Sequence, residues 1–337
     1  MIAAEKYYVQ PAAAAPLAKP ATGQLGRDHP ADYVPDLGLV DAVNVALILQ
    51  RPLLVTGDPG TGKTQLAFSV AWQLASRGKL NVGSPNVERF EAKSSSVARD
   101  LFYTFDALGR FQAGSGSGSL NNAAYITYNA LGRALLRSLP HDQVSDCLSP
   151  DFEHGGPTRS VVLIDEIDKA PRDFPNDLLN EIDQMFFRIP EINNRRIGGP
   201  GQLLDDYRPL IFITSNSEKT LPDPFLRRCI YFNIPFPGKD ALQRILLARL
   251  QGLQPGKLVE DTLSFFYHVQ NSNRVRRKIS PPELIQWLSY MLARKADPHV
   301  GLKEASQVAL EGLSALVKND KDQQSVPDEL TNYFKQH

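Results

Sequence analysis

A glycine-rich segment between a short apolar run and a helical pattern restricts the possible folds of this chain more than any other feature. Its residues are Gly57, Asp58, Pro59, Gly60, Thr61, Gly62, Lys63 and Thr64, and Gln65 opens the expected helix. This is the G-x-x-x-x-G-K-[ST] spacing of a phosphate-binding loop. The glycines let backbone N–H groups converge on phosphate oxygens, Lys63 reaches the β- and γ-phosphates, and Thr64 can bind Mg²⁺. The segment predicts nucleotide binding.

Apolar runs of strand length alternate with helical patterns along the first two thirds of the chain. They are Leu53–Thr56, Val87–Phe90, Val161–Ile164, Leu210–Ile213 and Ile230–Ile234. This alternation is typical of an α/β fold whose parallel sheet is covered by helices on both faces.

Two connections are longer than a simple crossover needs, and we expect an insertion in each. The first, near residues 92–159, has helical patterns at 97–109 and 122–139 on either side of a flexible Gly/Ser-rich tip. The second, near residues 186–208, alternates apolar and polar residues around two asparagines, which predicts a β-hairpin.

We expect three parts in the chain. Residues 1–34 are rich in Ala and Pro and are predicted to be an extended arm with little to bury; Tyr7 and Tyr8 either dock on a neighbour there or have no role. Residues 35–237 form the nucleotide-binding domain, and residues 238–337 a small all-α lid domain. The lid helices are expected at 239–252, 258–271, 281–293, 302–317 and 327–335, with a polar link at 319–325.

Composition excludes some classes of protein. The 37 Lys+Arg residues balance 37 Asp+Glu residues, and this zero net charge disfavours a general nucleic-acid binder. Two cysteines, Cys147 and Cys229, cannot form a disulfide framework. No run approaches the roughly 18 apolar residues of a membrane span, and Met1–Gln10 does not resemble a secretory signal. We therefore expect a soluble, cytoplasmic protein with no membrane span.

Polar side chains that suit phosphate chemistry follow two of the expected strands. After the third run, Asp165 is suited to hold Mg²⁺ and Glu166 to orient an attacking water. After the fourth, the amide of Asn216 is suited to contact that water or the γ-phosphate, although an Asx turn is the simpler alternative. Asp168 is expected only to cap the helix that follows.

Arginines precede the last strand and occupy the expected hairpin. Strand, asparagine, short helix, Arg227-Arg228, strand is the order in which ring-forming ATPases present an arginine finger to a neighbour. The hairpin arginines either contact an acidic substrate or nucleic acid in a ring pore or only keep the hairpin soluble; they are Arg188, Arg195, Arg196 and Arg208. His141, Cys147 and His154 match no usual zinc spacing.

Together these motifs resemble the AAA+ ATPases and, within them, the MoxR-like branch, over about residues 35–295. The segments that carry the resemblance are Pro52–Thr64, Phe90–Ser94, Asp100–Asp106, Leu163–Lys169, Phe174–Leu179, Ile213–Asn216 and Asp223–Cys229. The resemblance implies a P-loop NTPase that uses ATP and Mg²⁺, usually as a hexameric ring of identical subunits. It also implies remodelling or activation of a partner protein, often one with a von Willebrand factor A type domain.

The resemblance also assigns roles. It implies that Lys63 and Thr64 contact phosphate and Mg²⁺, that Asp165 holds Mg²⁺, that Glu166 is the catalytic base and that Asn216 senses hydrolysis. Arg228 aligns best as the finger offered to the neighbouring subunit, and Arg227 is the second candidate.

The lid departs from the family pattern. Many relatives have Ser-Pro-Arg where this chain has Ser280-Pro-Pro-Glu283. Arg277 or Lys278 is expected to replace the missing arginine at the γ-phosphate, unless the basic run that contains them, Arg274–Lys278, is simply solvated.

Two other functions stay open. A nucleotide-gated signalling or assembly scaffold with low turnover is one, and the presence of Glu166 argues against it. A DNA- or RNA-associated motor on the same fold is the other, and the neutral charge argues against it.

Overall fold

The chain is described here by a computed structural model. It describes residues 6–10, 29–113, 122–149, 152–216, 219–250 and 253–336. These described residues belong to two compact units: the first lies within 1–17, 35–57 and 63–234, and the second within 18–34, 58–62 and 235–337. Each unit has its own hydrophobic core.

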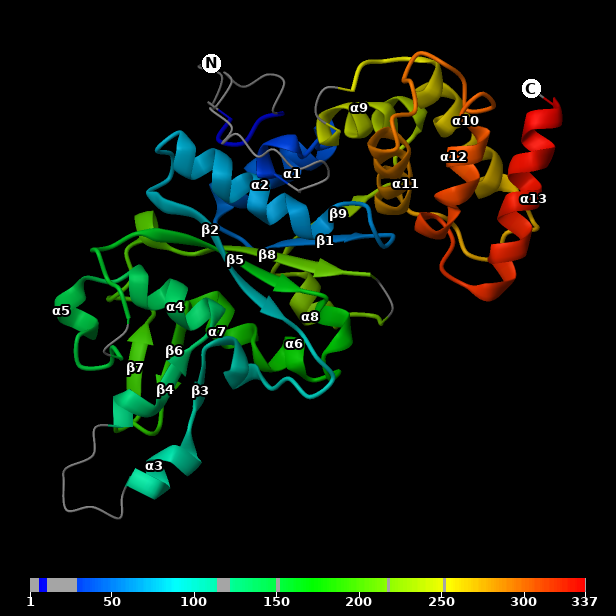
Figure 1. Ribbon diagram of the computed structural model, residues 1–337. Coiled ribbons are helices and arrows are strands. Elements are labelled where there is room, and N and C mark those ends of the chain that lie inside the picture. Colours follow the sequence, from blue (N-terminus) through cyan, green and yellow to red (C-terminus); the bar gives the residue numbers. More distant parts are fainter. Residues whose placement is uncertain are drawn as a thin grey trace. The chain divides into compact units, whose positions relative to one another are not determined.

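A five-stranded parallel sheet forms the centre of the first unit (Figure 1). Its strands are β1 (Leu53–Gly57), β2 (Val82–Glu91), β5 (Arg159–Asp165), β8 (Leu210–Ser215) and β9 (Ile230–Ile234). Their spatial order is β2-β5-β8-β1-β9, and every adjacent pair is parallel. The predicted α/β fold and all five strands are confirmed, with β2 starting earlier than expected.

Helices cover both faces of this sheet, which is why its strands appear in the sequence as unbroken apolar runs. On one face lie α1 (Leu37–Leu49) and α2 (Lys63–Ser76), and on the other α4 (Ala130–Arg137), α6 (Phe174–Asp177) and α7 (Leu179–Gln184) (Figure 1). Along β5, Val162 and Ile164 belong to the same core as α4. A short helix, α8 (Asp223–Leu226), precedes β9.

The first insertion contains an antiparallel strand pair that the sequence did not predict. Its elements are η3 (Ala98–Leu101), β3 (Tyr103–Phe105), α3 (Ala107–Ala113), η4 (Asn122–Tyr125), β4 (Ile126–Tyr128), α4 and α5 (His141–Val144). The helix expected over 97–109 is therefore wrong, and the helix expected over 122–139 forms only as α4. Aromatic and β-branched residues crowd both strands, and such residues favour a pleated surface over a helix. The Gly/Ser-rich tip lies outside the described residues.

The second insertion is the predicted hairpin, made of β6 (Phe186–Ile189) and β7 (Arg195–Gly198). Its turn holds Asn193 and Asn194 at φ values of 49° and 55°. Asparagine tolerates this left-handed region better than most residues, so the two asparagines suit the turn.

The two insertions pack on each other through one aromatic side chain, Phe187, which is buried. Its ring stacks on Phe102 with centroids 5.2 Å apart and meets Tyr128 edge-on at 6.4 Å. A hydrogen bond of 2.8 Å from the Tyr103 hydroxyl to Glu191 adds a polar link. The insertions thus share one core.

Helices make up the C-terminal part of the second unit. They are α9 (Lys239–Arg249), α10 (Lys257–Asn271), α11 (Pro281–Ala293), α12 (Ser306–Glu311) and α13 (Asp320–Gln336). The single helix expected over 302–317 is wrong, because a 3-10 turn, η7 (Leu313–Ala315), follows α12. The polar link expected at 319–325 is also wrong, since α13 begins at Asp320; acidic residues are favourable in a first helical turn.

The N-terminal arm was expected to bury little, and this is wrong for the residues that can be described. The side chain of Tyr8 is fully buried, and its hydroxyl lies 3.1 Å from that of Ser69 on α2. Further along, residues Pro30–Asp32 form a 3-10 turn, η2. Within the described ranges, no helix has both the length and the apolar character needed to cross a bilayer.

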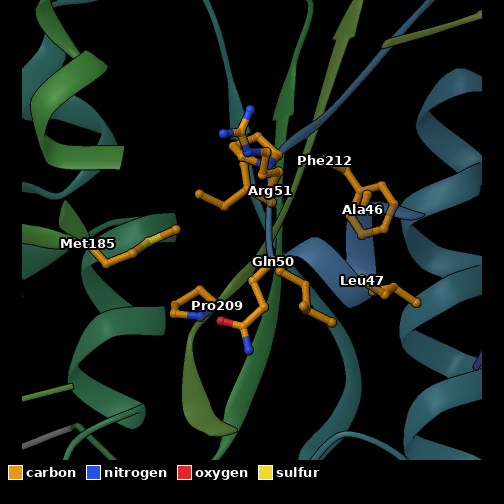
Figure 2. A pocket seen from close by; sticks show the side chains of 10 residues that line it. Ala46, Leu47, Gln50, Arg51, Met185, Pro209 and Phe212 are labelled. Carbon is orange, nitrogen blue, oxygen red and sulfur yellow. The ribbon is translucent and has the colours of Figure 1, made fainter. Parts of the chain in front are cut away.

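A small, mainly apolar cavity of about 10 Å³ lies at the end of the sheet where β8 begins (Figure 2). Ala46, Leu47, Met185, Pro209 and Phe212 are among its lining residues. The opposite end, at the carboxyl ends of the strands, carries the polar residues that the sequence singled out. We therefore look for the functional site there.

Candidate functional site

The glycine-rich loop joins β1 to α2. Gly60 and Gly62 have φ values of 81° and 90°, which residues with a Cβ rarely adopt. A Cβ on Gly62 would also lie 3.0 Å from the ring of Tyr33. Lys63 is largely buried, and its Nζ donates a 2.8 Å hydrogen bond to the carbonyl of Gly57. The lysine amine is thus held at the loop, where phosphate oxygens are expected.

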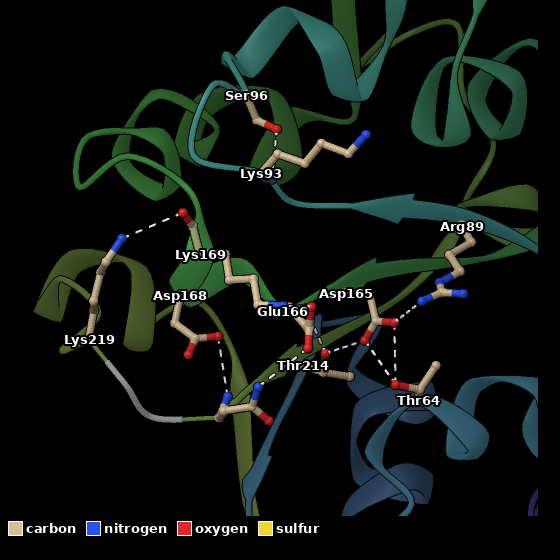
Figure 3. Close-up of polar contacts among 11 residues, drawn as sticks. Thr64, Arg89, Lys93, Ser96, Asp165, Glu166, Asp168, Lys169, Thr214 and Lys219 are labelled. Atoms are coloured by element: carbon tan, nitrogen blue, oxygen red, sulfur yellow. Dashed lines mark hydrogen bonds and ion pairs between the residues drawn. The ribbon is translucent and has the colours of Figure 1, made fainter. Parts of the chain in front are cut away.

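Asp165, at the end of β5, is the centre of the polar network in Figure 3. It is 2% exposed. Its carboxylate accepts hydrogen bonds from Thr64 Oγ1 at 3.0 Å and from Thr214 Oγ1 at 2.6 Å. Arg89 on β2 forms an ion pair with it at 2.7 Å. Thr64 and Asp165 therefore lie together. Arg89 and Thr214 were not identified as site residues from the sequence.

The donor set around Asp165 fits Mg²⁺. A threonine hydroxyl and a carboxylate are hard oxygen ligands, and Mg²⁺ usually takes few protein ligands and completes its shell with water and phosphate oxygens. Thr64 and Asp165 already lie within hydrogen-bond distance next to the phosphate-binding loop. These two residues are the ones that would hold the ion.

Glu166 follows Asp165 in a strained backbone conformation, with φ 57° and ψ 48°. A non-glycine residue in this left-handed region persists only where its surroundings hold it, and such residues gather at functional sites. Its N–H donates a 2.8 Å hydrogen bond to Thr214 Oγ1, and its carboxylate pairs with Lys169. The Asn216 amide donates to Glu166 Oε1 at 3.4 Å. The carboxylate is thereby aimed between the ends of β5 and β8.

Asp168 has a different role from the helix cap that we expected. It is 2% exposed, and its Oδ1 accepts a 3.2 Å hydrogen bond from the backbone N–H of Asn216. Asp168 therefore fixes the main chain of the residue whose side chain meets Glu166 (Figure 3).

The two arginines before β9 have different environments. Arg228 forms an ion pair with Asp183, and its NH1 donates to the carbonyl of Pro224 at 2.9 Å. Arg227 is exposed, and its carbonyl accepts a 3.2 Å hydrogen bond from Arg51. The guanidinium of Arg228 is thus anchored within its own chain, while that of Arg227 faces solvent.

The backbone of the basic run Arg274–Lys278, in the second unit, is held by Asp322. This carboxylate accepts backbone hydrogen bonds from Arg276 at 2.9 Å and Arg277 at 3.1 Å. Burial alone would raise the pKa of Asp322, but these bonds and one from Asn319 outweigh it and lower that pKa below its usual range. The side chain of Lys278 is exposed.

The same run contains an internal ion pair. The guanidinium of Arg277 lies 3.2 Å from Glu283, the residue that completes the capping box of α11. Of the two candidates for a replacement γ-phosphate sensor, Arg277 is therefore engaged within its own unit.

The remaining candidates form no second site. The rings of His141 and His154 meet edge-on at 5.5 Å, and Cys147 is buried. Within the described part of the chain, no three or more His, Cys, Asp or Glu residues are grouped so as to hold a metal ion. Burial raises the pKa of the Cys147 thiol and raises that of Cys229 to about 12.

Most hairpin arginines have partners in their own chain. Arg195 pairs with Asp146 at 3.3 Å, Arg196 lies over the ring of Phe186, and Arg208 donates to the carbonyl of Asp183 at 3.0 Å. Arg188 is exposed.

Comparison with known proteins extends these observations. The family described as "ATPase family associated with various cellular activities (AAA)" matches residues 53–237. Among solved structures, a RuvB variant of Thermotoga maritima is 14% identical, with a TM-score of 0.43, over 85% of this chain and 69% of that one. PCH-2 of C. elegans is 19% identical, with a TM-score of 0.39, over 82% of this chain and 67% of that one. No curated protein matches the sequence.

Proposed function

The chain belongs to the AAA family of ATPases, and from this premise we propose that it hydrolyses ATP within a ring of identical subunits, for which the resemblance implies a hexamer, to remodel or activate a partner protein. The observation that carries this proposal is the polar network at the ends of β5 and β8. It joins Thr64 to Asp165 and Asn216 to Glu166 at the loop that suits phosphates. A protein that only bound nucleotide would not need the second pair.

Each residue of the network has a distinct part in the proposed reaction. The loop N–H groups and Lys63 bind the phosphates, and Thr64 and Asp165 hold Mg²⁺, which neutralises phosphate charge when bound. The carboxylate of Glu166 accepts a hydrogen bond from the attacking water and orients it. Asn216 donates a hydrogen bond to that carboxylate and is the proposed sensor of the γ-phosphate.

An arginine from the neighbouring subunit completes the proposed site, because it stabilises the charge that develops in the transition state. The resemblance to the family pattern favours Arg228 for this role. Its ion pair with Asp183 and its bond to Pro224 favour an anchoring role instead, and leave the exposed Arg227 as the group available to a neighbour. We therefore propose Arg227 as the finger, positioned by Arg228.

The lid is proposed to respond to the same phosphate. Lys278 is exposed on a backbone held by Asp322, whereas Arg277 is paired with Glu283. This difference supports Lys278 as the replacement for the arginine that the Ser280-Pro-Pro-Glu283 segment lacks.

The finer assignment to the MoxR-like branch rests on the two insertions and on the sequence motifs. The structure has an insertion before β5 and a hairpin before β8, and the resemblance implies insertions at these two places in that branch. In that branch the output is remodelling of a partner protein, for which a von Willebrand factor A type domain is the candidate.

Steady-state ATPase assays test the proposal. Wild type should turn over ATP at concentrations where it assembles, and Glu166→Gln should lose turnover but retain ATP binding. Binding and assembly without turnover in wild type would favour the low-turnover scaffold. Stimulation of turnover by DNA or RNA would favour the motor.

Mixed assemblies test the neighbour's arginine. Lys63→Ala subunits bind nucleotide poorly but keep both arginines, whereas Arg227→Ala subunits keep the loop. Mixing the two inactive variants should restore activity at those interfaces where an Arg227→Ala subunit supplies the intact loop and a Lys63→Ala subunit supplies the intact arginine. Restoration with Arg228→Ala but not with Arg227→Ala would reverse the assignment, and restoration with neither would exclude a finger in trans.

A further inference from the structure

The N-terminal arm, residues 6–10, occupies a site built from polar side chains between α1 and α2. Asn44 on α1 contacts the backbone of Tyr8 twice: its Oδ1 accepts from the Tyr8 N–H at 3.0 Å, and its Nδ2 donates to the Tyr8 carbonyl at 2.8 Å. Gln73 on α2 contacts the backbone of Val9 in the same way: its Oε1 accepts from the Val9 N–H at 3.4 Å, and its Nε2 donates to the Val9 carbonyl at 2.9 Å. Two side-chain amides thus form hydrogen bonds with the backbone of two consecutive residues of an extended peptide.

A specificity pocket accompanies this backbone recognition. The ring of Tyr8 is fully buried, and its hydroxyl lies 3.1 Å from Ser69. Ser69 and Gln73 are themselves 0% exposed, and Asn44 is 6% exposed. With the arm in place these three side chains are covered, and the arm supplies a hydrogen-bond partner to each; Asn44 also donates to the Val40 carbonyl at 2.8 Å. We name this site, formed by Asn44, Ser69 and Gln73, the arm groove.

The length of chain behind the arm is greater than docking on its own groove requires. Gln10 Nε2 donates a 3.1 Å hydrogen bond to the carbonyl of Pro35, so the two ends of the connection are in contact. Yet 24 residues, 11–34, lie between them. A chain of that length spans on the order of 80 Å when fully extended. A linker of that length is long enough for the arm to reach the groove of a second copy, which is the geometric condition for exchange of an identical element between subunits.

We propose that the arm groove is a receptor for an extended, tyrosine-bearing peptide, and that in the assembled protein it is filled by the arm of a neighbouring subunit. This rests on the ring assembly of the proposed function. The exchanged arms link each subunit to the next at a site separate from the nucleotide network, so that assembly does not depend on nucleotide alone.

Cross-linking between two different full-length chains tests the exchange. Lys6 Nζ and Asp41 Oδ1 lie 2.6 Å apart, and both side chains are exposed. One chain carries Lys6→Cys, the other carries Asp41→Cys and a tag that changes its mass, and the two are co-expressed and treated with a short bismaleimide. Exchange predicts a covalent product of one chain with the other. Adding Tyr8→Ala to the first chain should abolish that product, whereas Tyr7→Ala should not.

Two further measurements separate the possible outcomes. A single chain with both Lys6→Cys and Asp41→Cys reports docking in cis as an internal cross-link. Internal cross-links alone, in samples that mass photometry shows to be assembled, would overturn the exchange and leave the ATPase proposal intact. Monomers under all conditions would overturn both. A mixed product that persists with Tyr8→Ala would show that the arm is not responsible, and would also overturn the exchange.

A peptide tests the groove itself without relying on assembly. The full-length Tyr8→Ala chain should release its own arm and bind a labelled peptide of residues 1–12 by fluorescence anisotropy. A peptide with Tyr8→Ala should bind at least about 30-fold more weakly, as expected for loss of a buried aromatic anchor. Equal binding of the two peptides would overturn the receptor. A folded-state check by circular dichroism accompanies the variant.

Discussion

Thr214→Val would test the polar network most directly, because one hydroxyl connects its two halves. Thr214 is 1% exposed, and its Oγ1 donates to Asp165 at 2.6 Å and accepts from the Glu166 N–H at 2.8 Å. Valine has nearly the same shape and removes both bonds. A hydrogen bond to a charged group contributes about 1.5–3 kcal/mol, and an unsatisfied buried N–H costs about 1–3 kcal/mol. Allowing for partial access of water at Glu166, we expect a loss of about 2–4 kcal/mol.

Calorimetry and ATPase kinetics measure this effect. At roughly 2–4 °C per kcal/mol for a domain of this size, the melting temperature of the first unit should fall by about 4–16 °C. Because the hydroxyl also holds the backbone of Glu166, kcat should fall by about 10- to 150-fold, the equivalent of one charge-assisted hydrogen bond. KM should change little, since Lys63 and the loop are untouched.

Thr262→Val provides the matched control. Thr262 on α10 is also fully buried, but its hydroxyl has no hydrogen-bond partner within the described residues. Removing an unsatisfied hydroxyl should leave stability unchanged or raise it. The reasoning fails if the two variants lose equal stability, or if Thr214→Val retains wild-type kcat.

Three further predictions follow from the packing and the titratable groups. Phe187→Ala should destabilise the first unit by about 3–5 kcal/mol in denaturant titrations because both insertions lose their shared ring, while Phe186→Ala, at a half-buried position, should cost less. Native protein should show almost no reaction of Cys147 or Cys229 with a thiol reagent at pH 8, since burial raises both pKa values and only the thiolate reacts; two reactive thiols should appear on unfolding. Asp322→Asn should lower the melting temperature of the second unit at pH 7. Because the folded pKa of Asp322 lies below the unfolded value of 3.8, that difference should shrink as pH falls below about 4 and the wild-type carboxyl becomes protonated.

The sheet could be predicted from the sequence because burial on both faces leaves a simple pattern. Leu53–Gly57 and Arg159–Asp165 are apolar along most of their length. A continuous apolar run of this kind is typical of a buried parallel strand or of a longer buried helix. The three-residue strands Tyr103–Phe105 and Ile126–Tyr128 are too short to show a period. They form because each pairs with the other and both pack on the hairpin, which no local pattern reports.

The candidate site was predictable where one element dictates the position of a residue. Asp165 and Glu166 end a strand, and Thr64 opens the helix after the loop. Arg89 was missed because its role depends on which strand lies beside β2, and on a register that sets Arg89 opposite Leu163.

The buried Tyr8 was missed for a related reason. It lies in the short segment Lys6–Gln10, just before an Ala/Pro-rich stretch, and this segment shows no helical or strand period that would indicate burial. The contacts that hold it come from helices distant in the sequence: the Asn44 amide on α1 bonds its backbone, and Ser69 on α2 lies 3.1 Å from its hydroxyl.

The left-handed backbone of Glu166 has an evolutionary consequence. Glycine adopts this conformation without strain, so Glu166→Gly should fold as well as wild type or better, by about 1 kcal/mol. It would lack the carboxylate that orients water. Selection for stability alone would therefore move this position toward glycine, and only selection for turnover would retain glutamate. A deep mutational scan that scores abundance and ATPase activity separately should rank the two residues in opposite orders at position 166.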